Sequence, residues 1–532
     1  MDELKKLFGV DLLCYILACE AGDLETPTAS WSEARQSVLG QLEIIQVGVS
    51  GQEAIQQSMA VSSVILRHQS DCNTSLANLW RMRCGGEVYE VSNSADACAG
   101  LLQALARDLY PFYLMPIRED GFAHFFGPGA ELYQHPLHMI FAQAVLEDSD
   151  LCKLFPGREN SGMDNIDEAA QLGSFIRFSS GAGFTYQLVM LAMQLLSAGY
   201  HRQVMLGKYG YANFVDAVTC ALFDARSLAR REKISTPVIV GLSGVVPLTE
   251  EVAFGECILR RVKSDDFVLL PANSGITAVL VAEVAFELLE VSKWRMGQEL
   301  AVSDPGQHQK AYESWHKEIR DLVNDVRFAL LCSSDGANYI TARQEGLASL
   351  SPLGNGHRVH EMSRNFAGPS SELSGDQARL ASEWYARISR DGGNIDIAIR
   401  RILSAVSERF DAVDGLIDAV MAWENMFSGT PETTVRVCGS LANLLESTDY
   451  PARVSLFREL KKIYNMRSKL VHGASDEPSL DDTFKARNRA IEIALSAARR
   501  VYEMEGFSVK KSAERSEMLL LWAVPHQDSA GE

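Results

Sequence analysis

Arg467-Ser-Lys-Leu-Val-His472 closes a long amphipathic segment that decides how the C-terminal part of the chain folds. The segment follows Asp449-Tyr-Pro451, where an acidic capping residue comes before a proline suited to the first turn of a helix. It stops at Gly473, and glycine is common just past the end of a helix. Between these points apolar residues recur at intervals of three and four, at Leu456, Leu460, Ile463, Tyr464, Leu470 and Val471. The spacing predicts one amphipathic helix that ends at Gly473.

Arg467 lies on the apolar stripe of this predicted helix, three residues after Tyr464 and four before Val471. A charged side chain at such a position needs a partner or a chemical role, because an unpaired buried charge is costly. Glu424 also lies on an apolar stripe, that of a helix with Ile417, Val420 and Phe427. We therefore expect Glu424 to pair with Arg467. Two roles stay open for Glu424: fixing the orientation of Arg467 in an active site, or joining two helices by a structural ion pair.

His472 and Ser468 share one sector of the helix end with Arg467, because Ser468 lies one turn before His472. The helix dipole favours imidazolium at this end, and histidine can donate or accept a proton near neutral pH. Cleavage of RNA without metal needs a base, an acid and a cation for the developing phosphorane charge. Arginine binds phosphate oxygens in bidentate geometry. The residue types suit phosphodiester cleavage, although a histidine at a helix end is often only a cap.

The sequence around this helix resembles a known family. Tyr464-Asn-Met-Arg-Ser-Lys-Leu-Val-His-Gly473 is similar to the motif Tyr-x-x-Arg-Ser-x-x-x-His-Gly of the ApeA-like branch of the HEPN superfamily. Residues 397–401, 410–418 and 422–427 resemble the second helix of that family, and the likeness covers about residues 373–507. Its departures lie away from the proposed chemistry: Trp423 and Met426 in place of leucines, and Gly415 in place of a longer polar residue.

The resemblance implies a helical bundle that dimerises, so that two Arg-x4-His motifs form one metal-independent endoribonuclease site without a cofactor. We expect Arg467, His472, Glu424 and Ser468 to form its catalytic part, and a homodimer or higher homo-oligomer. The family is associated with bacterial defence against phage by abortive infection, which implies a phage-derived trigger sensed or restrained by the N-terminal region. Some HEPN domains bind without cutting, so a non-catalytic binding or scaffold protein is the alternative.

The charge of the chain is acidic overall and basic at this helix. A net charge of −19 argues against a chain that coats nucleic acid electrostatically. From Arg453 to His472, however, six basic residues stand against the single acid Glu459, a balance of +5. We expect the contacts with RNA phosphates to come from Arg458, Lys461, Lys462 and Lys469.

The length of the chain and the changing residue pattern along it predict a multidomain protein that is mainly α-helical with a β-rich middle module, and the family resemblance implies a C-terminal HEPN bundle. We expect a mainly helical domain of no recognised family at 1–232, a β-rich module with a following helix at 233–348, a linker at 349–375, the HEPN domain at 376–510 and a tail at 511–532. Short segments in the middle module, such as 241–246 and 254–261, resemble the β segment before the bundle in ApeA-like proteins.

Individual elements follow from periodicity and turn residues. Helices are expected at 1–20, 31–46, 95–109, 186–200 and 309–331. Strands are expected at 236–240, 251–254, 257–259 and 267–270. His135 and His138 have metal-ligand spacing, but Pro136 between them and the lack of neighbouring cysteine or acidic partners disfavour a metal.

Cysteine usage and the chain start indicate a cytoplasmic protein. The ten cysteines include no C-x-x-C pair, and several lie in apolar segments, which indicates a reducing compartment. The first residues carry mixed charge, unlike a signal peptide. The apolar run Leu188–Ala198 is too short to cross a bilayer, so we expect no membrane association.

Overall fold

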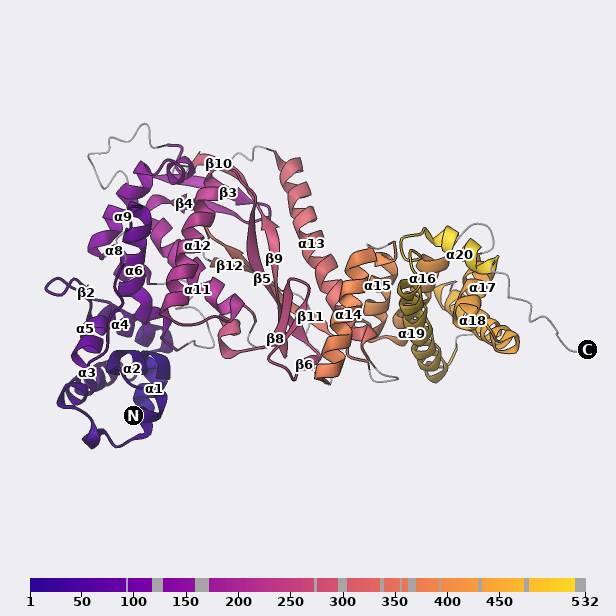
Figure 1. The fold of residues 1–532 in the computed structure, drawn as a ribbon, viewed down its shortest axis with the longest axis horizontal. Helices are drawn as coiled ribbons and strands as arrows, with labels where there is room; N and C mark the ends of the chain where they lie inside the picture. Colours follow the sequence, from indigo (N-terminus) through magenta and orange to yellow (C-terminus); the bar gives the residue numbers. More distant parts are fainter. Residues whose placement is uncertain are drawn as a thin grey trace, which may run out of the picture.

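The computed structural model describes most of the chain. It gives full detail for residues 1–91, 94–116, 128–157, 172–271, 275–294, 304–334, 339–354, 370–390, 394–428, 433–471 and 478–521, and the backbone alone for 356–361, 391 and 472. The protein is mainly helical with a β-rich middle, as the sequence predicts. It is elongated: N-terminal helices lie at one end, the sheets in the middle and C-terminal helices at the other end (Figure 1). Within the described part of the chain, no helix combines the length and the apolar character that crossing a membrane requires.

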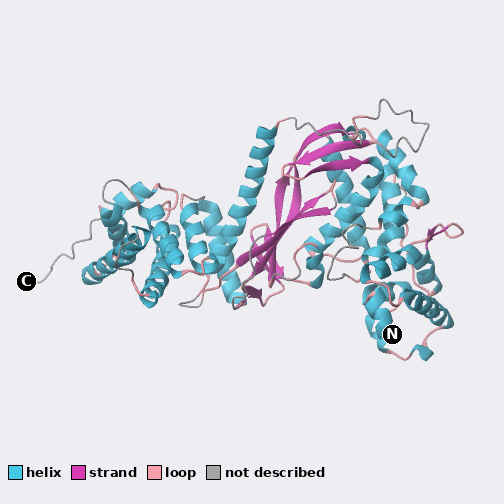
Figure 2. Ribbon diagram, turned by 180° about the vertical axis from the view of Figure 1, so that it is seen from behind, coloured by secondary structure: helices cyan, strands magenta, loops and turns pink. Residues whose placement is uncertain are grey.

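A six-stranded antiparallel sheet occupies the middle of the molecule (Figure 2). Its strands, in spatial order, are β12 (Gly356–Glu361), β11 (Arg343–Ser351), β5 (Ile234–Ser243), β9 (Ala278–Phe286), β8 (Cys257–Arg261) and β7 (Glu251–Phe254). Side chains alternate between the two faces of a strand. In β5, Val238 and Val240 pack into the core shared with the C-terminal helices, whereas Ile239 packs into the core shared with the N-terminal helices. The sheet is therefore a wall between two hydrophobic cores.

Three smaller sheets accompany the six-stranded sheet in the described part of the chain. A three-stranded antiparallel sheet has the order β10 (Leu288–Trp294), β3 (Gly173–Phe178), β4 (Gly183–Gln187), and β6 (Val245–Pro247) pairs in parallel with β13 (Ser371–Leu373). Because β10 follows β9 after one residue, the chain passes directly from the large sheet into the three-stranded sheet. The hairpin β1 (His68–Gln69) and β2 (Thr74–Ser75) lies apart from both.

The N-terminal core is built by helices and by one face of the sheet. The helices are α1 (Asp2–Phe8), α2 (Val10–Leu17), α3 (Glu33–Val49), α4 (Ala54–Ile65), α5 (Leu76–Arg83), α6 (Ala97–Tyr113), α8 (Gly129–Tyr133), α9 (Pro136–Glu147), α11 (Leu191–Leu206) and α12 (Tyr211–Ala229). Short 3-10 helices lie at Ala21–Glu25, Thr28–Ser30, Leu151–Leu154, Leu188–Met190 and Ser264–Val268. Helices α11 and α12 touch at Gly199, where an added Cβ would lie 2.4 Å from a methyl of Val218.

The C-terminal core joins the opposite face of the sheet to a helical domain. Its helices are α13 (Pro305–Cys332), α14 (Gly375–Asp391), α15 (Asp396–Leu403), α16 (Ala412–Phe427), α17 (Thr433–Leu445), α18 (Tyr450–His472), α19 (Leu480–Glu503) and α20 (Ser512–Leu520), with a π-helical turn at Ser404–Glu408. Arg515 of α20 is fully buried, and its guanidinium donates to the carbonyls of Met426, Ser508 and Lys510. This arginine fixes α20 to the end of α16.

Several expected boundaries are wrong. The expected boundary at 232/233 cuts through one core, because β3 and β4 share a sheet with β10 and the N-terminal core includes side chains from both sides of that boundary. The expected linker 349–375 holds the end of β11 together with β12 and β13, and the expected tail 511–532 begins with α20, which packs on α17.

Three expected elements also differ. The helix expected at 1–20 is broken at Gly9, whose φ of +79° a residue with a side chain rarely adopts. Residues 186 and 187 belong to β4, so the helix expected at 186–200 starts only at Leu191. The strand expected at 267–270 is replaced by the end of a 3-10 helix, Ser264–Val268, in which Asp266 accepts a hydrogen bond from the backbone of Lys263.

Candidate functional site: the end of helix α18

Helices α16 and α18 bring the predicted site residues together. Asp411 caps α16 by accepting hydrogen bonds from the backbone of Val413 and Asp414. Asp449 accepts one from the backbone of Ala452 in the first turn of α18, as its place before proline predicts. Helix α18 then runs without interruption to His472, so the Arg-x4-His spacing lies on one continuous helix.

Helices α16 and α18 are in contact within the group of C-terminal helices at one end of the molecule (Figure 1), and Glu424 on α16 meets two side chains of α18. Tyr464 donates a hydrogen bond of 2.6 Å to Oε1 of Glu424, and Nη2 of Arg467 lies 3.6 Å from Oε2 of the same carboxylate. The predicted pairing of Glu424 with Arg467 is confirmed. Burial, and then the hydrogen bond with Glu424, raise the pKa of Tyr464 to about 12, so the phenol stays protonated and remains a donor.

The guanidinium of Arg467 retains unused hydrogen-bonding capacity. Its side chain is 19% exposed, and its Nε is buried without a hydrogen-bond partner in the part of the chain that the structure describes. Its carboxylate partner lies at ion-pair distance rather than at the distance of a normal hydrogen bond. A cation held by one carboxylate, with donors left over, can accept an anionic ligand such as a phosphate.

Ser468 is half-buried next to Arg467 on the same helix. The backbone of His472 forms the last residue of α18, and its side chain lies outside the described residues, as does Gly473. Val471, the residue before His472, is exposed. The helix end that carries the motif therefore reaches the surface.

All four residues predicted to contact RNA line one cavity of about 580 Å³ on α18. Its wall consists of Arg458, Lys461, Lys462, Asn465, Met466, Lys469 and Pro478. Among the described residues, no carboxylate belongs to this wall, so the described part of the cavity concentrates positive charge on an otherwise acidic chain. The cavity wall does not include Arg467, Ser468 or Glu424. The charged cavity and the Arg467–Glu424 ion pair are therefore two neighbouring features at α18.

The contact of Tyr464 with Glu424 is what reasoning from the sequence missed, because Tyr464 was assigned to the apolar stripe and to the family motif without a partner. Tyr464 is largely buried, and its hydroxyl is the closest contact that Glu424 makes. The signal for it was present: among the apolar residues of the stripe, Tyr464 alone carries a polar group, and the phenol of a buried tyrosine usually finds a hydrogen-bond partner.

Asp414 and Asp418 do not form the common acidic face that their spacing suggests. Asp418 is buried and accepts hydrogen bonds from Arg401, Arg409 and Ser404, which together lower its pKa against the effect of burial. Asp414 is exposed and lies 3.8 Å from Arg409. Asp418 therefore anchors α15 and the π-helical turn to α16, a structural role.

The two histidines with metal-ligand spacing point to different partners. Nε2 of His138 bonds the carbonyl of Val189 at 2.8 Å, whereas Nε2 of His135 lies 3.1 Å from Asp108. His68 joins this second group, with its Nδ1 3.9 Å from the same oxygen of Asp108. Nothing in the local sequence pointed to His68 or Asp108 here, because they come from β1 and α6.

The hydrogen bonds of His135 decide what this group can do. The backbone N–H of Leu137 donates to Nδ1 of His135, so Nε2 carries the ring proton and donates it to Asp108. Thr74 and Arg107 donate to the other oxygen of Asp108. In this tautomer Nε2 is engaged with Asp108, and the arrangement is a buried hydrogen-bond network that holds α9 to α6.

A small acidic cavity separates α13 from α15. Asp325 faces Asp321 and Asp396 in this space of about 130 Å³, and Arg400 lies in the same wall. Burial, and then the charges of Asp396 and Asp321, raise the pKa of Asp325 to about 7. This carboxyl titrates near neutral pH at the junction of the sheet core and the helical domain.

Comparisons with known proteins returned no match to a family model, to a curated protein or to a solved structure. The chemistry of the site therefore rests on its residues. Helix α18 carries a cationic guanidinium with spare donors, and Glu424 of α16 supplies a fixed carboxylate beside it. The same helix ends in a histidine and lines a cavity with lysines and an arginine. This combination can hold a phosphate backbone next to an ionisable group.

Proposed function

We propose that the protein is a metal-independent endoribonuclease of HEPN type, with its active site at the end of α18. The observation that carries the proposal is the Arg467–Glu424 pair: a cation on an apolar stripe, oriented by a carboxylate that Tyr464 holds, beside a cavity lined by the four predicted RNA-contacting residues. The likeness of residues 464–473 to the ApeA-like HEPN motif supports the same assignment.

The proposed reaction is an internal transfer within RNA. One histidine removes the proton of a ribose 2′-hydroxyl, and the 2′-oxygen attacks the adjacent phosphorus. The bond from phosphorus to the 5′-oxygen breaks, and a second acid protonates that oxygen, which leaves a 2′,3′-cyclic phosphate and a 5′-hydroxyl. Arg467 stabilises the extra negative charge that develops on the phosphate oxygens. No metal is needed in this sequence of proton transfers.

The reaction needs two proton-transfer groups, and the motif of one chain supplies one histidine, His472. We therefore propose a homodimer across a two-fold axis at the end of α18, so that each chain contributes one His472. Three exposed apolar side chains flank this end and support a contact with a second copy: Val471 on α18, and Leu480 and Phe484 in the first turns of α19.

A role in defence against phage, with the N-terminal and middle regions sensing a trigger or restraining the site, belongs to the proposal and rests on the family resemblance alone. The second candidate function is a non-catalytic RNA-binding protein. The basic cavity favours it, because binding needs only the charges of α18. In that case Arg467 and Glu424 serve as an ion pair between α16 and α18.

The deciding experiment incubates purified protein with total RNA in EDTA and compares wild type with His472→Ala. We expect wild type to cleave and to leave 2′,3′-cyclic ends, and the variant to be slower by at least about a hundredfold while it stays folded. Equal rates on the same RNA would exclude a catalytic His472. Activity that disappears in EDTA and returns with magnesium would indicate another mechanism.

Mixing wild-type and His472→Ala subunits tests whether one active site is shared between two chains. Wild-type protein exchanged with an excess of His472→Ala protein should lose more activity than dilution explains, because each heterodimer lacks one histidine. Light scattering gives the assembly state of the same samples. An active monomer, or activity that follows only the amount of wild type after proven subunit exchange, would refute the shared site and require a second group from the same chain.

A further inference from the structure

A large cavity lies at the junction of the N-terminal helices and the sheet, far along the chain from the proposed ribonuclease site. It has a volume of about 750 Å³ and lies between α2, the end of α6, α11, the start of α12 and the 3-10 helix Ser264–Val268. This volume is within the range of cavities that hold small molecules.

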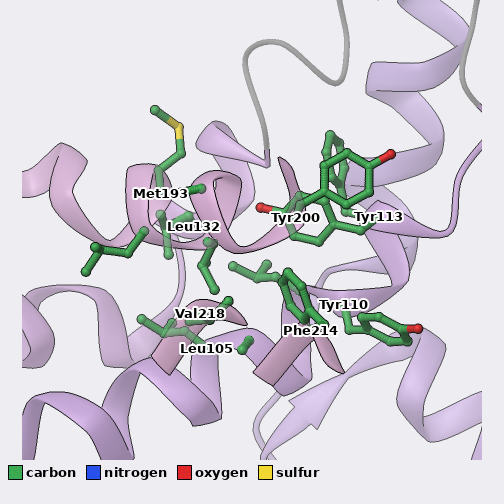
Figure 3. Close-up of a cluster of buried hydrophobic side chains, with 14 of the residues drawn as sticks. Leu105, Tyr110, Tyr113, Leu132, Met193, Tyr200, Phe214 and Val218 are labelled. Atoms are coloured by element: carbon green, nitrogen blue, oxygen red, sulfur yellow. The ribbon is translucent and has the colours of Figure 1, made fainter. Parts of the chain in front are cut away.

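Tyrosines dominate the wall of this cavity. Seven of the 15 tyrosines in the chain line it. The rings of Tyr89 and Tyr211 are stacked with their centroids 3.8 Å apart, and those of Tyr113 and Tyr200 lie 4.9 Å apart. Figure 3 shows Tyr110, Tyr113 and Tyr200 at one side of a buried cluster whose other side is aliphatic. The aromatic side of this cluster faces the cavity.

Hydrophobic packing alone does not account for this composition. A core would be filled by the aliphatic side chains that occupy the other side of the same cluster (Figure 3). Instead, a space remains between phenol rings whose hydroxyls stay protonated, because burial raises the pKa of Tyr15, Tyr110, Tyr200 and Tyr209. Electron-rich aromatic faces around an open space are suited to a cationic guest.

One end of the cavity carries two carboxylates, Asp11 and Asp265. Burial, and then the charge of Asp265, raise the pKa of Asp11, so the two groups repel each other. Asp11 has no hydrogen-bond or ion-pair partner within the described ranges. After burial, the charge of Asp265 also contributes to the raised pKa values of Tyr200 and Tyr209, which places this carboxylate against the aromatic wall.

Arg81, which lines the cavity wall, already has partners for its positive charge within the protein. Its Nε donates to the carbonyl of Glu87, its Nη1 donates to the carbonyl of Tyr15, and its guanidinium carbon lies 4.5 Å from the centre of the Tyr15 ring. Arg81 therefore serves as part of the wall, and Asp11 is left without a counterion.

We propose that this cavity is a binding site for a small organic cation, an ammonium or guanidinium group on an apolar or aromatic body. Asp11 and Asp265 bind the charged group, and the tyrosine faces enclose its body. Because the wall combines helices α2, α6 and α11 with a segment next to β8, the bound cation holds the N-terminal helices against the sheet. The site is independent of RNA cleavage.

Calorimetric titration of the full-length protein tests the proposal with three probes of different shape: benzyltrimethylammonium, agmatine and spermidine. We expect at least one to bind with a Kd below about 1 mM and to raise the melting temperature. Asp11→Asn should weaken that binding about tenfold, because it removes the unpaired carboxylate and keeps the shape. The substitution removes no hydrogen bond or ion pair of Asp11 within the described ranges, so the variant should fold normally.

The matched control is Asp71→Asn, an exposed aspartate outside the cavity wall that changes the net charge equally. It should leave binding unchanged. Tyr89→Leu, which removes a half-exposed stacked ring, should weaken binding independently of charge. The proposal is wrong if none of the three probes binds up to about 10 mM, if Asp11→Asn binds as wild type does, or if an anionic planar ligand such as adenosine monophosphate binds more tightly than every cation.

Discussion

Replacing Glu424 by glutamine tests whether this carboxylate positions Arg467 for chemistry. The substitution keeps an oxygen that can accept the hydrogen bond of Tyr464 and removes the negative charge 3.6 Å from the guanidinium. At an effective dielectric constant of about 20, two unit charges at this distance attract by roughly 4 to 5 kcal/mol. The two side chains are 23% and 19% exposed, and the desolvation of such ions offsets most of that attraction. The net coupling should be about 1 kcal/mol.

We expect Glu424→Gln to lower the free energy of unfolding by only about 1 kcal/mol and the rate of RNA cleavage by about ten- to a hundredfold, because a guanidinium that is no longer oriented loses contact with the transition state. Urea unfolding and single-turnover cleavage of one labelled RNA measure the two effects. Glu459→Gln is the matched control: it breaks an ion pair of α18 with Arg489 and leaves Arg467 untouched. It should not change cleavage.

A double-mutant cycle with Arg467→Met separates the two roles of Glu424. A positioning residue gives a small coupling in stability and a large coupling in the cleavage rate. Unchanged cleavage together with a loss of stability in Glu424→Gln would refute the positioning role and leave the ion pair between α16 and α18 as its only function.

Three other variants test separate parts of the structure. Combining Lys461→Gln with Lys462→Gln should weaken RNA binding and reduce the slope of log affinity against log salt by about 1 to 2, which filter binding over a range of salt measures; an unchanged slope would exclude these lysines from the phosphate contacts. Arg515→Met should lower the free energy of unfolding by about 3 kcal/mol in urea, because buried carbonyls lose their donor; a change within error would contradict this. Asp325→Asn should stabilise the protein by about 2 kcal/mol near pH 8 and have little effect near pH 4. The pKa of Asp325 is about 7 in the folded protein against 3.8 ordinarily, so the folded state loses a stabilising proton as pH rises through that range. Thermal melts of wild type and variant at both pH values measure the difference in stability, which should disappear near pH 4.

The C-terminal site was largely predictable, because its signals are local. Strong helical periodicity, a capping acid and a glycine bound α18, and the structure ends that helix where the sequence predicts. The pairing of Glu424 with Arg467 was predictable for a different reason. Each charge lies on an apolar stripe, and two such charges on helices of one bundle have few partners other than each other.

The elements that were missed depend on partners distant in the chain. Tyr186 shows helical spacing with the residues after it, yet it lies in β4, because β3 beside it also pairs with β10 about a hundred residues later. Residues 349–375 carry the glycines and serines of a linker, but β13 within them is fixed by parallel pairing with β6. The tyrosine cavity assembles five separate regions of the chain, so no local spacing could indicate it.

Hydrogen bonds made with α13 connect the middle sheet to the C-terminal helical domain. Arg327 of α13 donates hydrogen bonds to the carbonyl of Ala342, just before β11, and to Ser407 in the π-helical turn that leads into α16. Arg499 of α19 donates to the carbonyls of Leu331 and Cys332 at the end of α13. A single helix is thereby bonded to the residue before β11, to the π-helical turn before α16 and to α19. A shift of the sheet would move α13 or break these buried bonds, so the sheet is linked through α13 to the turn that leads into α16, the helix that carries Glu424.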